Sequence, residues 1–468
     1  MIEMHAEQRM DMDRAPGHQS KTLIVGLGKT GLSCARYLRA RGVMAAVTDS
    51  RPQPPGLDTL RAQMPELAIF VGGFDPEVFA AATQLVVSPG VPVAEPLIQE
   101  AIARGVPVIG DVELFARAAQ APICAITGSN GKSTVTTLVG LMARLAGRRV
   151  AVGGNLGEPV LDLLEQQADL YVVELSSFQL ETTPGLRADV SVVLNVSADH
   201  LDRYSDLADY AETKAAVYRG AGVSVVNRDD PLVLAMPRAS EREIGFTLGD
   251  PGPDDLGLRQ LAVSASEPET LWICHGDVPL MPASEVAIPG RHNLANALAA
   301  LALALACGIP REPACEALRT FPGLPHRSEL VGERDGVRWY DDSKGTNPGA
   351  TVAALDGLIA EGTSARAVLI AGGVGKGADF QPLLAAVKRA ARAVVLIGRD
   401  APLIEAVLAG AVPLAHASDM ADAVGQAAAL AQPGDCVLLS PACASFDMFD
   451  NYEHRGRVFA DAVRRLVS

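Results

Sequence analysis

The chain has 468 residues, and its 40 basic and 55 acidic side chains give a formal net charge of −15. This balance argues against a nucleic-acid-binding surface spread over the protein, and the 49% of apolar residues argue against a disordered chain. Only 4% of the residues are aromatic, which predicts cores of Ala, Val and Leu, as in parallel sheets covered by helices.

Short apolar runs that predict strands alternate with runs that predict helices along the chain. This alternation is typical of βαβ units and predicts an α/β fold of mostly parallel sheets. Turn-rich breaks near residue 110 and at residues 321–328 predict three domains, which we place at 21–110, 111–323 and 324–468, the first and last of them Rossmann-like. The predicted strands lie within residues 21–28, 45–50, 84–90, 121–129, 170–177, 189–197, 223–230, 366–373, 392–400 and 435–442.

The sequence predicts a cytoplasmic protein. Residues 1–20 mix charges of both signs without an apolar run, so we expect a disordered tail and no secretory signal. The longest apolar stretch, residues 294–309, is shorter than the ~20 residues of a membrane-spanning helix and predicts a buried helix. The seven cysteines are widely spaced and include no C-x-x-C pair, so we expect neither a disulfide framework nor a zinc site.

The first glycine-rich loop, residues 26–31 (GLGKTG), follows a predicted strand and precedes a predicted helix, and Asp49 ends the next strand. This spacing is that of a dinucleotide-binding fingerprint. The same geometry serves any pyrophosphate or nucleotide-sugar, and Asp49 also fits an ordinary turn. The loop alone therefore leaves both an NAD-dependent oxidoreductase and a nucleotide-sugar site open.

A second loop runs from Gly128 to Thr134 (GSNGKST) between an apolar strand and a helix. Such a loop presents backbone N–H groups and the positive end of a helix dipole to phosphate. Lys132 would reach the β- and γ-phosphates, and Ser133 would offer its hydroxyl to Mg²⁺. The general P-loop pattern has glycine where Ile126 stands, so a coincidental glycine turn is the alternative for the loop taken alone.

Two possible metal ligands end the next predicted strands. Glu174 ends one strand, and His200 follows another, so both would lie at the same sheet edge as the phosphate loop. A carboxylate and a neutral imidazole there suit a metal that also contacts phosphate. The alternatives are a helix-capping Glu and a surface His, and Lys214 on the following helix is by itself an ordinary surface charge.

The rest of the chain offers fewer signals. Residues 248–284 have little periodicity and predict a small antiparallel excursion or a long loop. Arg327 lies at a suspected hinge, and Asp342 and Lys344 follow a predicted strand, although surface salt bridges would explain each of these equally well. Lys376 lies in a third glycine-rich loop and is a plausible anion contact, with a flexible turn as the alternative.

Seven segments, taken in order, resemble the Mur ligase family over nearly the whole chain after the tail. The resemblance implies a central domain of the P-loop ATPase type and an ATP-dependent ligase that forms an amide bond through an acyl phosphate in peptidoglycan synthesis, with two Mg²⁺ ions. Residues 26–33 and 440–447 are most similar to members that add D-glutamate to UDP-N-acetylmuramoyl-L-alanine, and we expect a monomer. The segments are TGSNGKST (127–134), ELSSFQLE (174–181), NVSADHLDRY (195–204), PGRHNLANALAA (289–300), LPHRSE (324–329), DDSKGTNP (341–348) and SPACASFDMFDNYEHRG (440–456).

The resemblance also assigns roles to residues. Catalytic roles fall to Lys132, Glu174, His200, Lys214 and Lys344, and metal ligation to Ser133, Glu174, His200 and a CO₂-derived carbamate on Lys214. ATP contacts are Gly128, Asn130, Gly131, Lys132, Ser133, Thr134, Asn296, Arg327 and Asp342. Contacts to the UDP substrate are Lys29, Thr30, Asp49, Ser50, Arg51, Gly90, Asn155 and His200, and contacts to D-glutamate are Thr346, Lys376, Ser445, Phe446 and Tyr452.

Two residues depart from the family pattern, and four other functions stay open. Val374 stands where an acidic residue is expected, and Lys29 occupies a position that is often apolar. The nearest rivals are another Mur-type ligase and a folylpolyglutamate synthase, against which the first loop argues. A noncatalytic ATP-binding switch would need no acceptor pocket, and an oxidoreductase would not explain the second loop.

Overall fold

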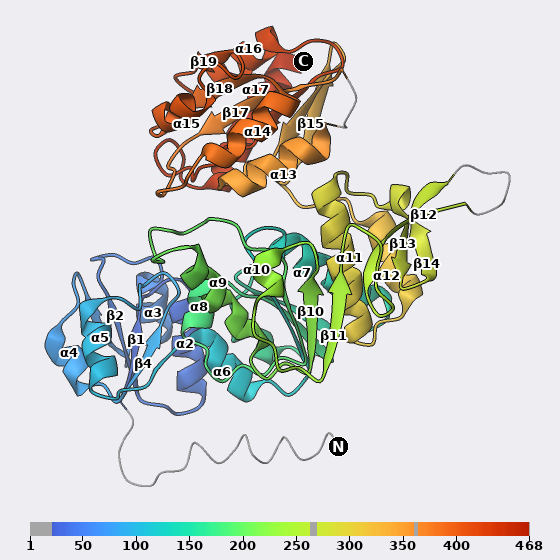
Figure 1. The fold of residues 1–468 in the computed structure, drawn as a ribbon. Helices are drawn as coiled ribbons and strands as arrows, with labels where there is room; N and C mark the ends of the chain where they lie inside the picture. Colours follow the sequence, from blue (N-terminus) through green and yellow to red (C-terminus); the bar gives the residue numbers. More distant parts are fainter. Residues whose placement is uncertain (1–20, 263–268, 360–363, 468) are drawn as a thin grey trace.

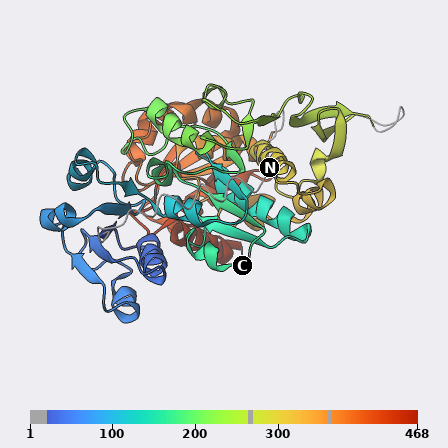
Figure 2. The same ribbon diagram turned by 90° about the horizontal axis from the view of Figure 1, so that it is seen from below.

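The structure is a computed structural model that describes residues 21–262, 269–359 and 364–467, so the predicted tail at residues 1–20 lies outside the described residues. Three sheets follow one another along the chain. The part around the third sheet lies over the other two in Figure 1, and seen from below it is largely hidden behind the central part (Figure 2). The α/β fold predicted from the sequence is confirmed.

The first sheet is parallel, with the order β3-β2-β1-β4-β5. The chain reverses its direction of travel across the sheet between β1 and β4, and ligands of such sheets bind at this switch point. The strands are β1 (Thr22–Val25), β2 (Ala45–Asp49), β3 (Ala68–Val71), β4 (Gln84–Val87) and β5 (Val108–Ile109), and the helices are α2 (Lys29–Ala40), α3 (Leu57–Gln63), α4 (Pro76–Ala81), α5 (Pro96–Ala103) and α6 (Asp111–Ala118).

The second sheet has the order β14-β13-β12-β11-β10-β9-β6-β8-β7. Its parallel part places β6 between β8 and β9, so the loop after β6 also lies at a switch point. The strands are β6 (Ile123–Thr127), β7 (Val150–Gly154), β8 (Leu170–Glu174), β9 (Val190–Val193), β10 (Val223–Asn227), β11 (Arg242–Phe246), β12 (Leu256–Leu261), β13 (Thr270–His275) and β14 (Val278–Pro282). The helices are α7 (Lys132–Leu145), α8 (Ser177–Glu181), α9 (Leu207–Ala215), α10 (Pro231–Leu234), α11 (Arg291–Ala306) and α12 (Arg311–Thr320).

The described residues of the segment 248–284, which are 248–262 and 269–284, form an antiparallel excursion, the first of the two predicted alternatives. β12 pairs with β13 and β13 with β14, both antiparallel, whereas β11 pairs with β12 in parallel through Phe246 and Leu256. The predicted buried helix within residues 294–309 is the C-terminal part of α11, where the side chains from Ala297 to Ala304 are buried. Among the described residues, no helix is long and apolar enough to cross a membrane.

The third sheet has the order β15-β16-β20-β17-β18-β19, in which β15 and β16 pair antiparallel and the other described pairs are parallel. One sheet ends and the next begins near each of the two predicted domain boundaries. The exact limits of the domains stay predictions. The strands are β15 (Glu329–Arg334), β16 (Val337–Asp341), β17 (Ala367–Gly372), β18 (Ala391–Ile397), β19 (Leu414–His416) and β20 (Cys436–Leu439), and the helices are α13 (Pro348–Leu358), α14 (Gln381–Ala390), α15 (Ala401–Leu408), α16 (Met420–Leu430) and α17 (Tyr452–Val467).

The first glycine loop depends on a close contact between backbone segments. A Cβ on Gly31 would lie 2.0 Å from the carbonyl oxygen of Gly26, whose φ is 97°. That carbonyl also accepts a hydrogen bond from Ser88 Oγ at 2.9 Å, so it is held in place from β4. A Cβ on Gly28, by contrast, would meet no described atom within 4 Å. Gly31 therefore allows α2 to begin against the loop.

We predict that Gly31→Ala lowers the stability of the N-terminal part by about 3 kcal/mol, because a backbone carbonyl cannot move aside as a flexible side chain would. Gly28→Ala is the matched control and should cost less than about 1 kcal/mol, the scale of a helix N-cap change. Thermal unfolding of both variants checks this expectation. Equal unfolding midpoints for the two variants would contradict it.

Candidate active site

A cleft between the three sheets contains most of the residues that the sequence singled out. Its volume is about 970 Å³, and its walls include loops after β1, β2 and β4, after β6, β7 and β8, and after β16 and β17. The carboxyl ends of parallel strands thus converge on one space, as ligand sites in such sheets do. A second cavity of about 300 Å³ adjoins the cleft, and the two share Asn130, Gly131, Arg327 and Lys344.

The loop after β6 is built to receive an anion. Gly131 has a φ of 84°, and a Cβ on it would lie 2.3 Å from Asn296 Oδ1, so glycine lets α11 approach the loop. Lys132, the first residue of α7, donates from Nζ to the carbonyl oxygens of Gly128 and Ser129 at 2.9 and 3.0 Å. Backbone N–H groups, a helix N-terminus and an ammonium group therefore meet here, which is a phosphate-binding arrangement.

Two cations from the C-terminal part line the cleft together with this loop. Arg327 Nη2 donates to Ser133 Oγ at 2.8 Å, and Lys344 Nζ lies 3.8 Å from the centre of the Tyr452 ring. The pKa of Lys344 is lowered to about 8, first by burial and then by the neighbouring Arg327 and Lys132, while the Glu174 carboxylate acts in the opposite direction. Burial also lowers the pKa of Lys132. An anion between these side chains would offset their mutual repulsion.

Glu174 and His200 fit a divalent cation. The Glu174 side chain is buried, and its Oε1 accepts from Asn155 Nδ2 at 2.7 Å, whereas its Oε2 has no hydrogen-bond partner among the described residues. Burial lowers the pKa of His200 to about 4, so the imidazole is neutral at pH 7, as a metal ligand must be. Both residues line the cleft with Ser133, and such oxygen and nitrogen donors suit Mg²⁺.

Lys214 lies behind the phosphate loop, outside the described residues that line the cleft. Its side chain is buried, and Nζ donates to the Gly128 carbonyl at 3.0 Å and lies 4.4 Å from the centre of the Tyr210 ring. Burial and the nearby Lys132 lower the pKa of Lys214 well below its usual value. Carbamylation requires the neutral amine, and this environment favours that form.

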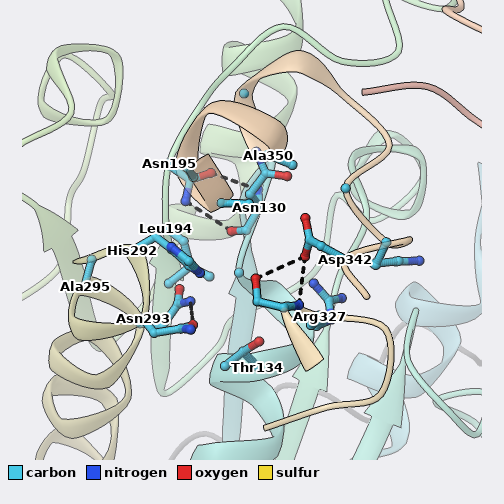
Figure 3. A pocket seen from close by; sticks show the side chains of 18 of the residues that line it. Asn130, Thr134, Leu194, Asn195, His292, Asn293, Ala295, Arg327, Asp342 and Ala350 are labelled. Carbon is cyan, nitrogen blue, oxygen red and sulfur yellow. Dashed lines mark hydrogen bonds between the residues drawn. The ribbon is translucent and has the colours of Figure 1, made fainter. Parts of the chain in front are cut away.

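The second cavity brings together six of the residues predicted to contact ATP: Asn130, Gly131, Thr134, Asn296, Arg327 and Asp342. Figure 3 shows Arg327 and Asp342 on one side of this cavity and Asn293, from α11, on the other. Asn296 Nδ2 donates to Asn293 Oδ1 at 3.2 Å, which orients both amides. Burial raises the pKa of Asp342 to about 7, so its carboxyl group can donate as well as accept a hydrogen bond near neutral pH.

The residues predicted to contact the UDP substrate lie together. Asp49 accepts from the backbone N–H groups of Leu27 and Arg51 at 2.7 and 2.9 Å, and its Oδ2 lies 2.7 Å from Arg51 Nη2. Burial raises the pKa of Asp49, but the Arg51 guanidinium and these N–H groups outweigh it and hold the pKa below its usual value. The glycine loop and Arg51 are thereby fixed to each other. The cleft is lined by all eight predicted contacts: Lys29, Thr30, Asp49, Ser50, Arg51, Gly90, Asn155 and His200.

The five residues predicted to contact D-glutamate lie in two different settings. Thr346, Lys376 and Tyr452 line the cleft, whereas Ser445 and Phe446 do not belong to its described walls. The backbone carbonyl of Ser445 accepts hydrogen bonds from Met448 and Phe449, which forms a turn after β20. This turn leaves the Phe446 side chain 75% exposed. The contacts of Ser445 and Phe446 to D-glutamate stay predictions.

Two residues that the sequence analysis did not single out join the central and C-terminal parts. Asp199 Oδ1 lies 2.9 Å from Lys376 Nζ, and Asn347 Nδ2 donates to Asp199 Oδ2 and to Asn130 Oδ1, each at 3.1 Å. Asp199 directly precedes His200, and Asn347 lies in the segment DDSKGTNP. Their positions within these segments could have marked both residues as candidates. Their contacts, however, form between the central and the C-terminal parts, which the sequence does not place relative to each other.

The two departures from the family pattern lie in different surroundings. Val374 pairs with Ala444 through two backbone hydrogen bonds of 2.9 Å, a contact that places no demand on its side chain. Lys29 is exposed at the start of α2 and lines the cleft. Lys29 therefore adds a positive charge where an apolar side chain would have none.

Comparison with known proteins gives consistent matches along the chain. Residues 20–110 match the model "Mur ligase MurD-like, N-terminal domain", residues 126–304 match "Mur ligase middle domain", and residues 326–443 match "Mur ligase, glutamate ligase domain". Proteins named UDP-N-acetylmuramoylalanine--D-glutamate ligase from Nitrosococcus oceani and Marinobacter nauticus are each 54% identical to it, over 97% and 95% of this chain and 98% of each relative. The Pseudomonas aeruginosa protein of that name is 52% identical over 95% of this chain and 98% of its own.

Solved structures agree on the fold. A UDP-N-acetylmuramate-alanine ligase from Thermotoga maritima superposes with a TM-score of 0.59 at 18% identity, covering 96% of this chain and 100% of that one. A pseudomurein peptide ligase type C from Methanothermus fervidus gives a TM-score of 0.58 at 17% identity, with the same coverage. At these identities the likeness concerns the arrangement of the chain.

We predict that Glu174→Gln weakens Mn²⁺ binding by at least about tenfold without lowering the unfolding temperature. The amide keeps an acceptor for Asn155 and removes a buried charge that has no described partner for its second oxygen. Electron paramagnetic resonance of free Mn²⁺ during titration measures the affinity. Glu158→Gln, at an exposed carboxylate outside the cleft lining, is the control, and equal Mn²⁺ affinity in the two variants would contradict the metal site.

Proposed function

The chain belongs to the Mur ligase family, and from that premise we propose that it joins D-glutamate to UDP-N-acetylmuramoyl-L-alanine in peptidoglycan synthesis. It is an ATP-dependent ligase that forms an amide bond. The observation that carries the proposal is the single cleft lined by residues of all three sheets, where a nucleotide-sugar, a triphosphate and an amino acid can meet. The names of the relatives that share more than half of their residues with this chain support the same substrates.

The chemistry needs an activated carboxylate. A free carboxylate is a poor electrophile because oxide is a poor leaving group, so we propose that the lactyl-alanine carboxylate of the substrate first takes the γ-phosphoryl group of ATP. The amine of D-glutamate then attacks the acyl phosphate, and phosphate leaves from the tetrahedral intermediate. Negative charge builds up on phosphoryl oxygens during the transfer, so fixed cations and N–H groups supply most of the rate enhancement.

The positive groups at the junction of cleft and cavity suit this transfer. We assign Lys132 and the loop from Gly128 to Thr134 to the β- and γ-phosphates, and Arg327 and Lys344 to the transferred group. Asn296 and Asp342 would hold the nucleoside in the second cavity. Support comes from the hydrogen bond of 2.8 Å between Arg327 and Ser133 and from the pKa of Lys344, which burial and then the nearby cations Arg327 and Lys132 lower.

We propose two Mg²⁺ ions, one held by Ser133 and Glu174 and the other by His200 and a carbamate on Lys214. Bound Mg²⁺ would neutralise charge on the phosphoryl oxygens. The Oε2 of Glu174, which has no hydrogen-bond partner among the described residues, and the neutral imidazole of His200 support these ligands. The buried amine of Lys214 with its lowered pKa supports the reaction with CO₂.

The two other substrates would occupy the remaining walls of the cleft. We assign the UDP group to the residues around the first glycine loop, where Lys29 and Arg51 offer positive charge to the diphosphate. Lys376, with Thr346 and Tyr452, would hold the carboxylates of D-glutamate. One chain supplies the whole cleft, which supports a monomer, and we place the ligase in the cytoplasm with domains at 21–110, 111–323 and 324–468.

A comparison of acceptors tests the function. Phosphate release is measured with ATP, Mg²⁺ and UDP-N-acetylmuramoyl-L-alanine in the presence of D-glutamate, L-glutamate, glycine, L-alanine or meso-diaminopimelate, and the product is identified by mass. We expect release coupled to an adduct with D-glutamate alone. Coupling to another amino acid would keep the family and overturn the acceptor, and release independent of the nucleotide-sugar would overturn the substrate assignment.

The carbamate has its own test. Lys214→Ala should lose at least about a hundredfold in turnover while its cleft stays intact, because the metal would lose an anionic ligand. Added short-chain carboxylates such as acetate should restore part of the activity. Full activity without rescue, or rescue by alkylammonium ions instead, would argue that the lysine acts as a cation.

A further inference from the structure

His326, at the start of the C-terminal part, has a left-handed backbone with a φ of 61°. Its N–H donates to Glu329 Oε2 at 2.9 Å, and its carbonyl accepts from the N–H of Lys344 at 3.1 Å. Its ring Nδ1 lies 2.7 Å from Asp341 Oδ2. A non-glycine residue keeps such a conformation only where several contacts determine it, and here the backbone and the ring are both held.

Asp341 is buried at the end of β16 and is surrounded by groups that it orients. Its Oδ1 accepts from the N–H of Ser343 at 2.9 Å. Helix α17 covers the pair so closely that a Cβ on Gly456 would lie 2.2 Å from His326 Nδ1 and 2.7 Å from Asp341 Oδ2. With Asp341 ionised, Nδ1 of His326 is the protonated nitrogen that donates to it. The ring therefore has one permitted position.

The next residue, Arg327, carries the guanidinium that donates to Ser133 Oγ and lines both the cleft and the second cavity. Ser328, on its other side, also has a left-handed backbone, with a φ of 49°, and its N–H donates to Asp342 Oδ1 at 3.0 Å. The backbone of Arg327 is thus fixed on one side through Asp341 and on the other through Asp342. Asp341 and His326 themselves lie outside the described walls of both spaces.

We propose that Asp341 is a positioning residue which, through the ring of His326, fixes the backbone from which Arg327 reaches the ATP phosphates. The inference rests on the proposed function only in taking ATP as the ligand of Arg327. It assigns to Asp341 an effect on nucleotide binding and none on the UDP-substrate site, whose residues come from the first two sheets. The identity of the amino acid acceptor does not enter the argument.

Calorimetric binding of a non-hydrolysable ATP analogue, with Mg²⁺, tests the proposal. Asp341→Leu should weaken this binding about tenfold, as expected when a hydrogen bond to a charged group is lost. Asp341→Asn keeps an oxygen that accepts from the ring and should stay within about threefold of the unchanged protein. Binding of UDP-N-acetylmuramoyl-L-alanine should not change in either variant, which separates positioning from a general loss of structure.

Two further variants keep the test decisive if Asp341→Leu does not fold. His326→Asn retains a residue that tolerates the left-handed backbone and removes the ring, so it should show the same tenfold loss. In an Arg327→Ala background, His326→Asn or Asp341→Leu should add no further loss, because both act through Arg327. Additive losses, equal weakening of both ligands, or unchanged analogue binding in folded His326→Asn would overturn the proposal.

Discussion

Repulsion between cations gathered in one cleft is the interaction that the arrangement of the three parts has to accommodate. Burial is the main cause that lowers the pKa of Lys132 and of Lys344. Arg327 adds to this effect at Lys132, and Arg327 and Lys132 together add to it at Lys344. Glu174 and Asp199 oppose this effect, and Asp199 itself pairs with Lys376. Cations that repel one another are thus gathered at this point, and bound polyanionic substrates would offset their repulsion.

The apolar cores fix the positions of these charges. The strands β6 and β8 are fully buried, and α7 and α11 pack against each other behind the phosphate loop. Small side chains along α11 allow this approach, and Asn296 on the same helix reaches Gly131. The C-terminal part reaches the central part through Arg327, which donates to Ser133, and through Lys376, which pairs with Asp199. The neutral amide of Asn347 adds hydrogen bonds to Asn130 and Asp199, so the site forms where the two parts touch.

The sequence predicted what local chemistry determines. Apolar runs between glycine-rich turns identified the parallel strands, and strand ends placed Lys132, Glu174 and His200 at one edge. Asp199, Asn347 and Asp341 were missed because their partners come from distant segments. The exposure of Phe446 could not be read from the sequence because the turn that exposes it depends on backbone hydrogen bonds. The choice between the two alternatives for residues 248–284 stayed open because β12 joins the parallel sheet through a single pair of residues.

The cavity and the cleft meet at the four side chains and backbone positions that they share. A small compound bound in one space would therefore have its edge against a compound bound in the other. Joining two such weak binders by a short linker turns the second encounter into an intramolecular one, at an effective concentration in the millimolar range. The shared wall between the cleft and the cavity thus makes the enzyme a suitable target for inhibitors assembled from two linked fragments. The gain in affinity would come from the linker and would require no new contact with the protein.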